Sequence, residues 1–214
     1  MIRAVIFDLD GTMVDTEKLW GDVMRRLAPR YGTEFDPAAH IKMMGKRDRE
    51  SLQAFKEHHG VEASVEDMVQ TRRKIILEDT GLIRTNKGLY ELLDLLEKLK
   101  IQKAVATSAF EAFADKVLTQ FDLKRRFGAI VTAGQVTHGK PHPEIYLEAA
   151  KRLGVKPSDC LALEDAEIGV ESAYNAGMKV FAIPHDSSRH HDFSKATKVI
   201  SSMAEIDEKL LHSV

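Results

Sequence analysis

The residues best suited to chemistry are two aspartates near the N-terminus. Asp8 and Asp10 stand one residue apart, directly after an apolar run at 5–7 and just before Gly11. The run has the composition of a buried strand, and the glycine with its polar neighbours is typical of a turn. Because catalytic groups of parallel sheets lie beyond the carboxyl ends of strands, both carboxylates are expected in a crevice. Two like charges this close are unfavourable unless a cation or a shared proton relieves them.

The alternatives for this motif are an ordinary acidic turn and a calcium site. An EF-hand loop needs a longer acidic spacing and a closing glutamate between two helices, whereas Thr12, Met13 and Val14 follow here. This motif alone does not exclude an ordinary acidic turn, so the interpretation depends on other segments of the chain.

Two further polar segments stand where strands end or helices begin. Thr107 and Ser108 follow a predicted strand, where a hydroxyl and backbone N–H groups suit a phosphate oxygen or simply cap the next helix. Lys140 precedes a predicted helix in a segment stiffened by Pro141 and Pro143. There it could contact an anion as a point charge, or be an exposed loop lysine.

A second acidic pair follows another apolar strand. Glu164 and Asp165 end this strand, and Asp165 alone could be a helix N-cap. Together with Asp8 and Asp10, they would bring four carboxylates to one crevice. A hard cation makes that arrangement reasonable, and Mg²⁺ suits oxygen ligands that include water and substrate phosphate. The residues therefore predict a magnesium site at the strand ends.

Strand-like and helix-like segments alternate from residue 88 onward, which predicts an α/β fold with a parallel sheet. After the N-terminal strand, we expect strands at 101–106, 129–132, 161–163, 180–183 and 198–200. The expected helices lie at 88–99, 110–121, 143–153, 168–175 and from about 203 onward.

Residues 16–85 break this alternation. They show helical patterns at about 16–31, 47–59 and 63–80, a short helix after Pro37, and no convincing strand. The simplest account is a helical unit inserted after the first strand. We therefore predict an α/β core of residues 1–15 and 86–214 and a small α-helical cap of residues 16–85.

Composition narrows the class of protein. The 214 residues are 43% hydrophobic and 30% charged with a net charge of -2, and no basic stripe indicates nucleic acid. No segment approaches the roughly 20 apolar residues of a membrane span, and none resembles a signal peptide, so we expect a cytoplasmic protein. Cys160 is the single cysteine, which excludes a disulfide within the chain.

Several charged or histidine-rich segments are expected to be solvated. The basic runs 46–47, 72–74 and 124–126 are predicted to form exposed helix faces. His185, His190 and His191 lie close in sequence, but no further ligand supports zinc, so we expect a solvated loop.

The motifs together resemble those of the haloacid dehalogenase-like hydrolases. Four signatures occur in the family's order: Asp8-Leu9-Asp10-Gly11-Thr12, Thr107-Ser108, Gly139-Lys140-Pro141, and Glu164-Asp165 with Gly169. The resemblance covers essentially the whole chain. The chain is similar to one subgroup in particular, that of β-phosphoglucomutase and small-metabolite phosphatases, in the stretch Met44-Gly45-Lys46 and in the order of its segments. It implies a Rossmann-like core with a helical cap.

The resemblance also implies a role for each matching residue. Asp8 would be the nucleophile that forms an aspartyl-phosphate, and Asp10 the general acid and then the base. Mg²⁺ would be held by Asp8, the backbone carbonyl of Asp10 and Asp165, with Glu164 as a ligand or neighbour. The transferring phosphoryl group would be held by Thr107, the Ser108 backbone and Lys140.

Substrate choice is expected in the cap, because the core motifs hold the phosphoryl group alone. The candidates that face the leaving group are Glu17, Trp20, Lys46, Arg47 and Arg49. Each has a simpler alternative. Trp20 suits packing between the two parts, Arg47 and Arg49 suit surface charges, and Glu17 suits a helix start.

The expected activity is Mg²⁺-dependent hydrolysis of a sugar phosphate or nucleoside monophosphate. Phosphosugar mutation is the nearest alternative, followed by phosphonate cleavage through a Schiff base on Lys46 and by a binding module without turnover. Dehalogenation leaves Asp10 and the Glu164-Asp165 pair without a task. The expected partner is a small phosphorylated metabolite, with no nucleic acid or membrane, and the chain is expected to be a monomer or weak homodimer.

Overall fold

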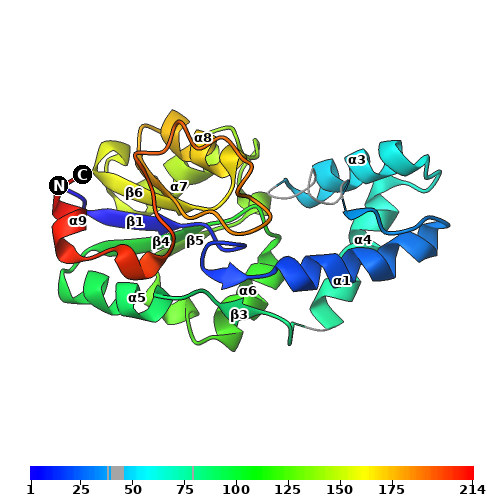
Figure 1. The fold of residues 1–214 in the computed structure, drawn as a ribbon, viewed down its shortest axis with the longest axis horizontal. Coiled ribbons are helices and arrows are strands. Elements are labelled where there is room, and N and C mark those ends of the chain that lie inside the picture. Colours follow the sequence, from blue (N-terminus) through cyan, green and yellow to red (C-terminus); the bar gives the residue numbers. More distant parts are fainter. Residues whose placement is uncertain (38, 40–45, 79) are drawn as a thin grey trace.

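A six-stranded parallel sheet is the centre of the larger part of the molecule (Figure 1). The computed structural model describes all residues except 38, 40–45 and 79. The strand order is β5-β4-β1-β6-β7-β8, with every neighbouring pair parallel. The strands are β1 (Ala4–Phe7), β4 (Gln102–Ala106), β5 (Ala129–Val131), β6 (Cys160–Glu164), β7 (Lys179–Ala182) and β8 (Lys198–Val199). The predicted α/β fold is confirmed.

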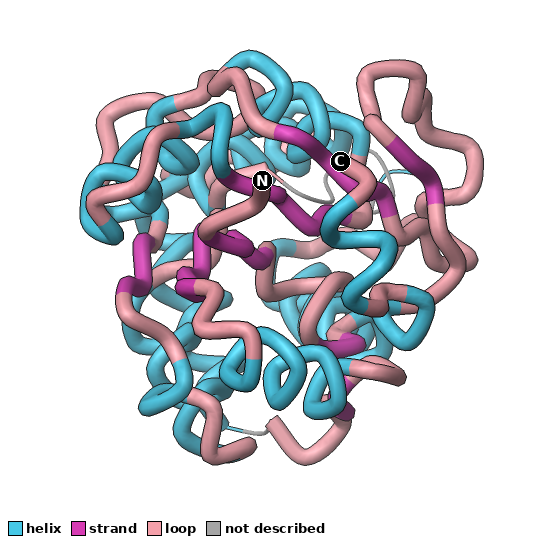
Figure 2. The backbone as a smooth tube through the Cα atoms, turned by 90° about the vertical axis from the view of Figure 1, so that its left-hand side faces the viewer, coloured by secondary structure: helices cyan, strands magenta, loops and turns pink. Residues whose placement is uncertain are grey.

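Helices cover both faces of the sheet. Figure 2 shows the strands lying between helical layers. On one face lie α7 (Glu144–Leu153) and α8 (Glu167–Asn175). On the other lie α5 (Leu89–Lys98), α6 (Glu111–Gln120) and α9 (Glu208–His212). Short 3-10 turns complete the connections at Ala28–Tyr31, Lys124–Arg126, Ala133–Gln135, Pro157–Asp159 and Met203–Glu205.

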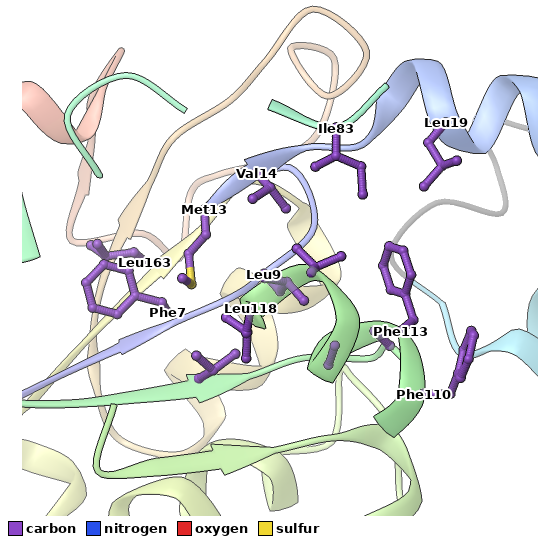
Figure 3. Close-up of a cluster of buried hydrophobic side chains, with 14 of the residues drawn as sticks. Phe7, Leu9, Met13, Val14, Leu19, Ile83, Phe110, Phe113, Leu118 and Leu163 are labelled. Atoms are coloured by element: carbon purple, nitrogen blue, oxygen red, sulfur yellow. The ribbon is translucent and has the colours of Figure 1, made fainter. Parts of the chain in front are cut away.

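The central strand β1 is apolar on both sides because both sides are buried. Val5 and Phe7 belong to one hydrophobic cluster, and Ala4 and Ile6 to a second one on the opposite face. Successive strand residues point to opposite faces, so a strand between two helical layers has no solvent-facing position. Figure 3 shows Phe7 within the first cluster. The sheet thus fixes β1 from both sides at the point where it delivers Asp8.

A group of three helices lies beyond the end of the sheet where β1 ends (Figure 1). These are α1 (Glu17–Leu27), α3 (Asp48–His59) and α4 (Val65–Glu78), and α4 contacts both of the others. The helices predicted at 16–31, 47–59 and 63–80 are confirmed. Trp20 of α1 packs against Phe113 of α6, with ring centroids 5.6 Å apart, and so joins this group to the sheet part.

One element of this region was not expected. β2 (Val14–Asp15) pairs antiparallel with β3 (Arg84–Thr85), whereas the prediction for residues 16–85 contained no strand. The ladder forms because the two connections between the sheet and the helices run side by side. Two residues are too few for a periodic pattern to reveal. The helix expected after Pro37, and Met44 and Gly45 of the subgroup motif, fall on or next to residues outside those described.

The chain's return to the sheet part depends on a glycine without space for a side chain. Gly88 has φ +86°, and a Cβ atom there would lie 2.2 Å from the backbone nitrogen of Ala204. Gly60 at the end of α3 also has a positive φ, +66°, but none of the described residues has an atom within 4 Å of its would-be Cβ. A comparison of alanine substitutions at the two glycines therefore separates the cost of backbone strain from the cost of a steric clash.

We expect Gly88→Ala to destabilise the protein more than Gly60→Ala. Both variants bear the left-handed penalty of about 1–2 kcal/mol, and Gly88→Ala adds an overpacking cost of about 1–3 kcal/mol. Urea unfolding measures both differences. Equal losses in the two variants would contradict the tight contact at Ala204.

Candidate active site

Neighbouring strands bring the predicted polar residues to one edge of the sheet. β1 lies between β4 and β6, and the backbone N–H of Asp8 donates to the Leu163 carbonyl at 3.0 Å. Asp8 follows β1, Thr107 follows β4, and Glu164 is the last residue of β6. The strand order therefore places these side chains close together at one edge of the sheet, as expected.

A buried lysine lies between two of the carboxylates. The Lys140 Nζ donates to Asp8 Oδ1 and to Glu164 Oε1, both at 2.5 Å, and to the Ala106 carbonyl at 3.2 Å. Lys140, Asp8 and Glu164 are 7%, 6% and 1% exposed. Burial lowers the pKa of Lys140, but the charges of Asp8 and Glu164 outweigh it and raise the pKa above its ordinary value. The two carboxylates therefore favour the charged form of Lys140.

Glu164 is fixed by its surroundings. Besides Lys140, the hydroxyl of Tyr146 donates to Oε1 at 2.6 Å, and the backbone N–H of Asp165 donates to Oε2 at 3.2 Å. A Cβ atom on Gly169 would lie 2.1 Å from this carboxyl group, so α8 packs directly onto it. Both carboxylate oxygens thus already have protein donors.

Asp165 is oriented by a hydrogen bond at each oxygen. The Thr12 hydroxyl donates to Oδ1 at 3.0 Å, and His185 Nε2 lies 2.9 Å from Oδ2. Gly11, with φ +84°, gives this carboxylate its space, because a Cβ atom there would lie 2.3 Å from Oδ2. The hydrogen bond to Asp165 raises the pKa of His185 above its ordinary value.

The donor set of this cluster fits a divalent cation. Carboxylate oxygens of Asp8, Glu164 and Asp165 lie within 4.8 Å of one another. Three carboxylates face one ammonium, so negative charge is in excess. Burial, and then the charges of Glu164 and Asp165, raise the pKa of Asp8 well above its ordinary value, although Lys140 opposes them. Hard oxygen donors with surplus negative charge are what Mg²⁺ and Ca²⁺ bind.

Asp10 lies outside this cluster and has a different environment. Its Oδ1 accepts a hydrogen bond from the indole Nε1 of Trp20 at 3.1 Å. Burial raises the pKa of Asp10 to about 6, even though the hydrogen bonds from Trp20 and Thr16 lower it. A carboxyl group with such a pKa can give and take a proton near neutral pH. The two N-terminal aspartates thus have different partners.

A cavity of about 110 Å³ opens in front of these groups. Asp8, Asp10, Thr107, Ser108, Lys140 and Asp165 all line it. Thr107 is 1% exposed, and its Oγ1 accepts from the Ala109 backbone N–H at 3.0 Å, which leaves the hydroxyl hydrogen available to a ligand. The core residues proposed for phosphate and metal binding therefore surround one space.

Some of the predicted cap residues reach this cavity and others do not. Glu17, Trp20 and Lys46 line it. The structure does not place Arg47 and Arg49 among the lining residues. Arg47 donates to the carbonyls of Thr137 at 3.0 Å and Val136 at 3.1 Å, and Arg49 pairs with Glu66 on the surface at 3.4 Å.

Comparison with known proteins identifies the family. The sequence model of the haloacid dehalogenase-like hydrolases matches residues 5–183. The chain belongs to this family. A phosphorylated carbohydrates phosphatase from Thermotoga maritima is 35% identical over 188 residues, which cover 86% of each chain. CbbY from Rhodobacter sphaeroides, solved in complex with phosphate, superimposes with a TM-score of 0.88 at 26% identity over 96% of each chain.

A mutase is also among the structural neighbours. β-Phosphoglucomutase from Clostridium difficile superimposes with a TM-score of 0.87 at 26% identity, over 100% of this chain and 96% of that one. The resemblance inferred from the motifs, including its subgroup, is confirmed. Within the described part of the chain, no helix is both long and apolar enough to cross a membrane.

Several residues at the site were not expected from the sequence. The prediction of a solvated face is wrong for Arg72, which is 5% exposed, lines the cavity and donates to Asp48 and Ser51 of α3. Its spacing was the available signal, because Met68 and Ile75 place position 72 on the apolar face of α4. The prediction of a solvated loop is wrong for His185, which lines the cavity and contacts Asp165. No such pattern points to Tyr146.

We expect Tyr146→Phe to lower stability by about 1–3 kcal/mol, because a buried carboxylate loses a donor. The Tyr146 side chain is fully buried, so solvent does not replace the donor that Glu164 loses. Tyr174→Phe is the control, since Tyr174 is 54% exposed and its change is expected within about 0.5 kcal/mol. Chemical denaturation compares the two. Equal effects would show that the Glu164 contact contributes little.

Proposed function

We propose that this protein is a Mg²⁺-dependent phosphatase that hydrolyses a small phosphorylated metabolite through an aspartyl-phosphate on Asp8. The observation that carries the proposal is the position of the Asp8 carboxylate. It accepts a hydrogen bond from the Lys140 ammonium and lies within 4.8 Å of carboxylate oxygens of Glu164 and Asp165, in a cavity that it shares with Asp10. This arrangement offers a nucleophile, a positive charge and a separate acid around one cavity.

The first half-reaction transfers the phosphoryl group to the protein. An Asp8 carboxylate oxygen attacks phosphorus, the bond from phosphorus to the ester oxygen breaks, and Asp10 protonates the departing oxygen. Lys140, the Thr107 hydroxyl and the Ser108 backbone hold the equatorial oxygens. Such positioning and charge neutralisation is most of what phosphoryl transfer requires.

The second half-reaction returns the enzyme to its starting state. Asp10, now ionised, takes a proton from a water molecule that attacks phosphorus. The bond between phosphorus and the Asp8 oxygen breaks, and inorganic phosphate leaves. The hydrogen bond from Trp20 fixes the direction of the Asp10 carboxylate, so the same group serves as acid and then as base.

The metal would be held by Asp8, Asp165 and the backbone carbonyl of Asp10. Glu164 is better suited to a position beside the metal, because its Oε1 accepts from both Lys140 and Tyr146, which occupies both lone pairs, and its Oε2 accepts from the Asp165 backbone. When bound, the cation would offset the repulsion between an anionic nucleophile and an anionic ester.

Substrate selection is proposed to lie in a helical cap of residues 16–85 over a core of residues 1–15 and 86–214. The lining of the cavity that contains Asp8 includes four residues of the helical part that suit this role, namely Trp20, Lys46, Asp48 and Arg72. The similarity to a phosphorylated carbohydrates phosphatase favours a sugar phosphate as the substrate, and nucleoside monophosphates belong in the same screen.

A phosphosugar mutase is the second candidate, favoured by the likeness to β-phosphoglucomutase. A mutase would return the phosphoryl group from Asp8 to another hydroxyl of the sugar instead of to water. Phosphate release from single monophosphates, measured beside isomer formation with a bisphosphate primer, separates the two. We expect phosphate release with no need for a primer.

We expect Asp8→Asn to abolish phosphate release and Asp10→Asn to lower kcat by about 10²–10⁴-fold. The first variant removes the nucleophile, and the second removes proton transfer while Asp8 stays in place. The assay uses a panel of sugar phosphates and nucleoside monophosphates with Mg²⁺ or with a chelator.

Asp22→Asn is the matched control, because Asp22 lies on α1 with a 43% exposed side chain and pairs with Arg26. It should keep wild-type activity. Near-normal turnover in Asp10→Asn would refute the acid–base role, and turnover in Asp8→Asn would refute the proposed function.

A further inference from the structure

The loop after β7 supplies a side chain that contacts Asp165. His185 stands three residues beyond β7, and its Nε2 lies 2.9 Å from Asp165 Oδ2. A carboxylate only accepts hydrogen bonds, so Nε2 carries the proton and donates it. The opposite oxygen, Oδ1, accepts from Thr12 at 3.0 Å. Asp165 is therefore held at both oxygens by groups from two different segments.

The imidazole is itself fixed from its far side. Ser187 Oγ lies 3.1 Å from His185 Nδ1, which completes a path from the serine through the ring to Asp165. The loop is closed by the Ser188 backbone N–H, which donates to the His185 carbonyl at 3.0 Å, and by the His185 N–H, which donates to Ser188 Oγ at 3.1 Å. Ser188 is 1% exposed, so the turn is anchored in the protein.

These contacts leave Asp165 able to bind a cation. Each carboxylate oxygen has two lone-pair positions, and one hydrogen bond per oxygen leaves the other free. Without a fixed partner, Asp165 would be pushed away by the neighbouring Asp8 and Glu164 carboxylates, since oxygens of all three lie within 4.8 Å. The donors at both oxygens oppose that movement and keep the carboxylate facing the cluster.

We propose that His185 is a positioning residue that holds Asp165 ready for the divalent cation and thereby sets the affinity of the site. This inference rests on the metal site of the proposed function. Groups that orient metal ligands typically change metal affinity by about 10–100-fold when they are removed. His185 acts through Asp165 and needs no contact with the substrate.

The test is the equilibrium affinity for metal alone, without substrate. Mg²⁺ binding is followed by calorimetry and Mn²⁺ binding by electron paramagnetic resonance, in the wild type and four variants. His185→Ala removes the donor, and His185→Gln replaces Nε2 by an amide nitrogen that can donate to the same oxygen. Asp165→Asn removes the ligand charge. His190→Ala is the control, because it alters an exposed histidine of the same loop.

We expect His185→Ala to bind both ions about 10–100-fold more weakly, His185→Gln to recover most of that loss, and His190→Ala to match the wild type. Asp165→Asn should lose more affinity than His185→Ala. Unfolding measured without metal shows whether each variant is folded. If His185 had a purely structural role, His185→Ala would lower the stability, and His185→Gln would not recover the metal affinity.

Two results would overturn the inference, and a third would overturn its basis. Wild-type affinity in His185→Ala, with weak binding in Asp165→Asn, would leave the metal site intact and remove His185 from it. Tighter binding in His185→Ala would show that the imidazole competes with the cation. Wild-type affinity in Asp165→Asn would refute the metal site itself.

Discussion

The contact on which the site depends is the Lys140 ammonium held between Asp8 and Glu164. Both distances are 2.5 Å, and all three side chains are buried. A lone ammonium or a lone carboxylate in this position would be strongly unfavourable, so each group needs the others. Asp165 adds a further negative charge that Lys140 does not balance. The surplus creates the demand for a divalent cation.

The fold explains why these charges can be assembled at all. A parallel sheet aligns the carboxyl ends of its strands, and β1 lies between β4 and β6. Three motifs far apart in sequence therefore end at one edge, while Lys140 reaches them from the loop before α7. The hydrophobic layers on both faces of β1 hold this edge rigid. Trp20 connects the helical part to the site, because its indole donates a hydrogen bond to Asp10.

The parts predictable from the sequence are those with a local signal. Apolar runs that end in polar residues located the strands and the core site residues, and helical periodicity located α1, α3 and α4. The β2–β3 pairing was missed because it joins positions about 70 residues apart through two residues each. The basic run at 72–74 indicates a solvated face by its charge, whereas Arg72 occupies a buried position on the apolar face of α4. The contact between His185 and Asp165 depends on the path of the loop after β7, for which the sequence has no local signal.

The central claim is that Asp8 accepts the phosphoryl group, and trapping the intermediate tests it most directly. The protein is mixed with Mg²⁺ and a substrate identified by phosphate release, and quenched in acid within the first turnover. It is then digested with an acid protease at low pH and sequenced by mass spectrometry. The account predicts a phosphoryl group on Asp8, which is acid-stable enough to survive the quench and absent from Asp8→Asn. Phosphorylation of Asp10 or of another residue, with Asp8 unmodified, would contradict the account.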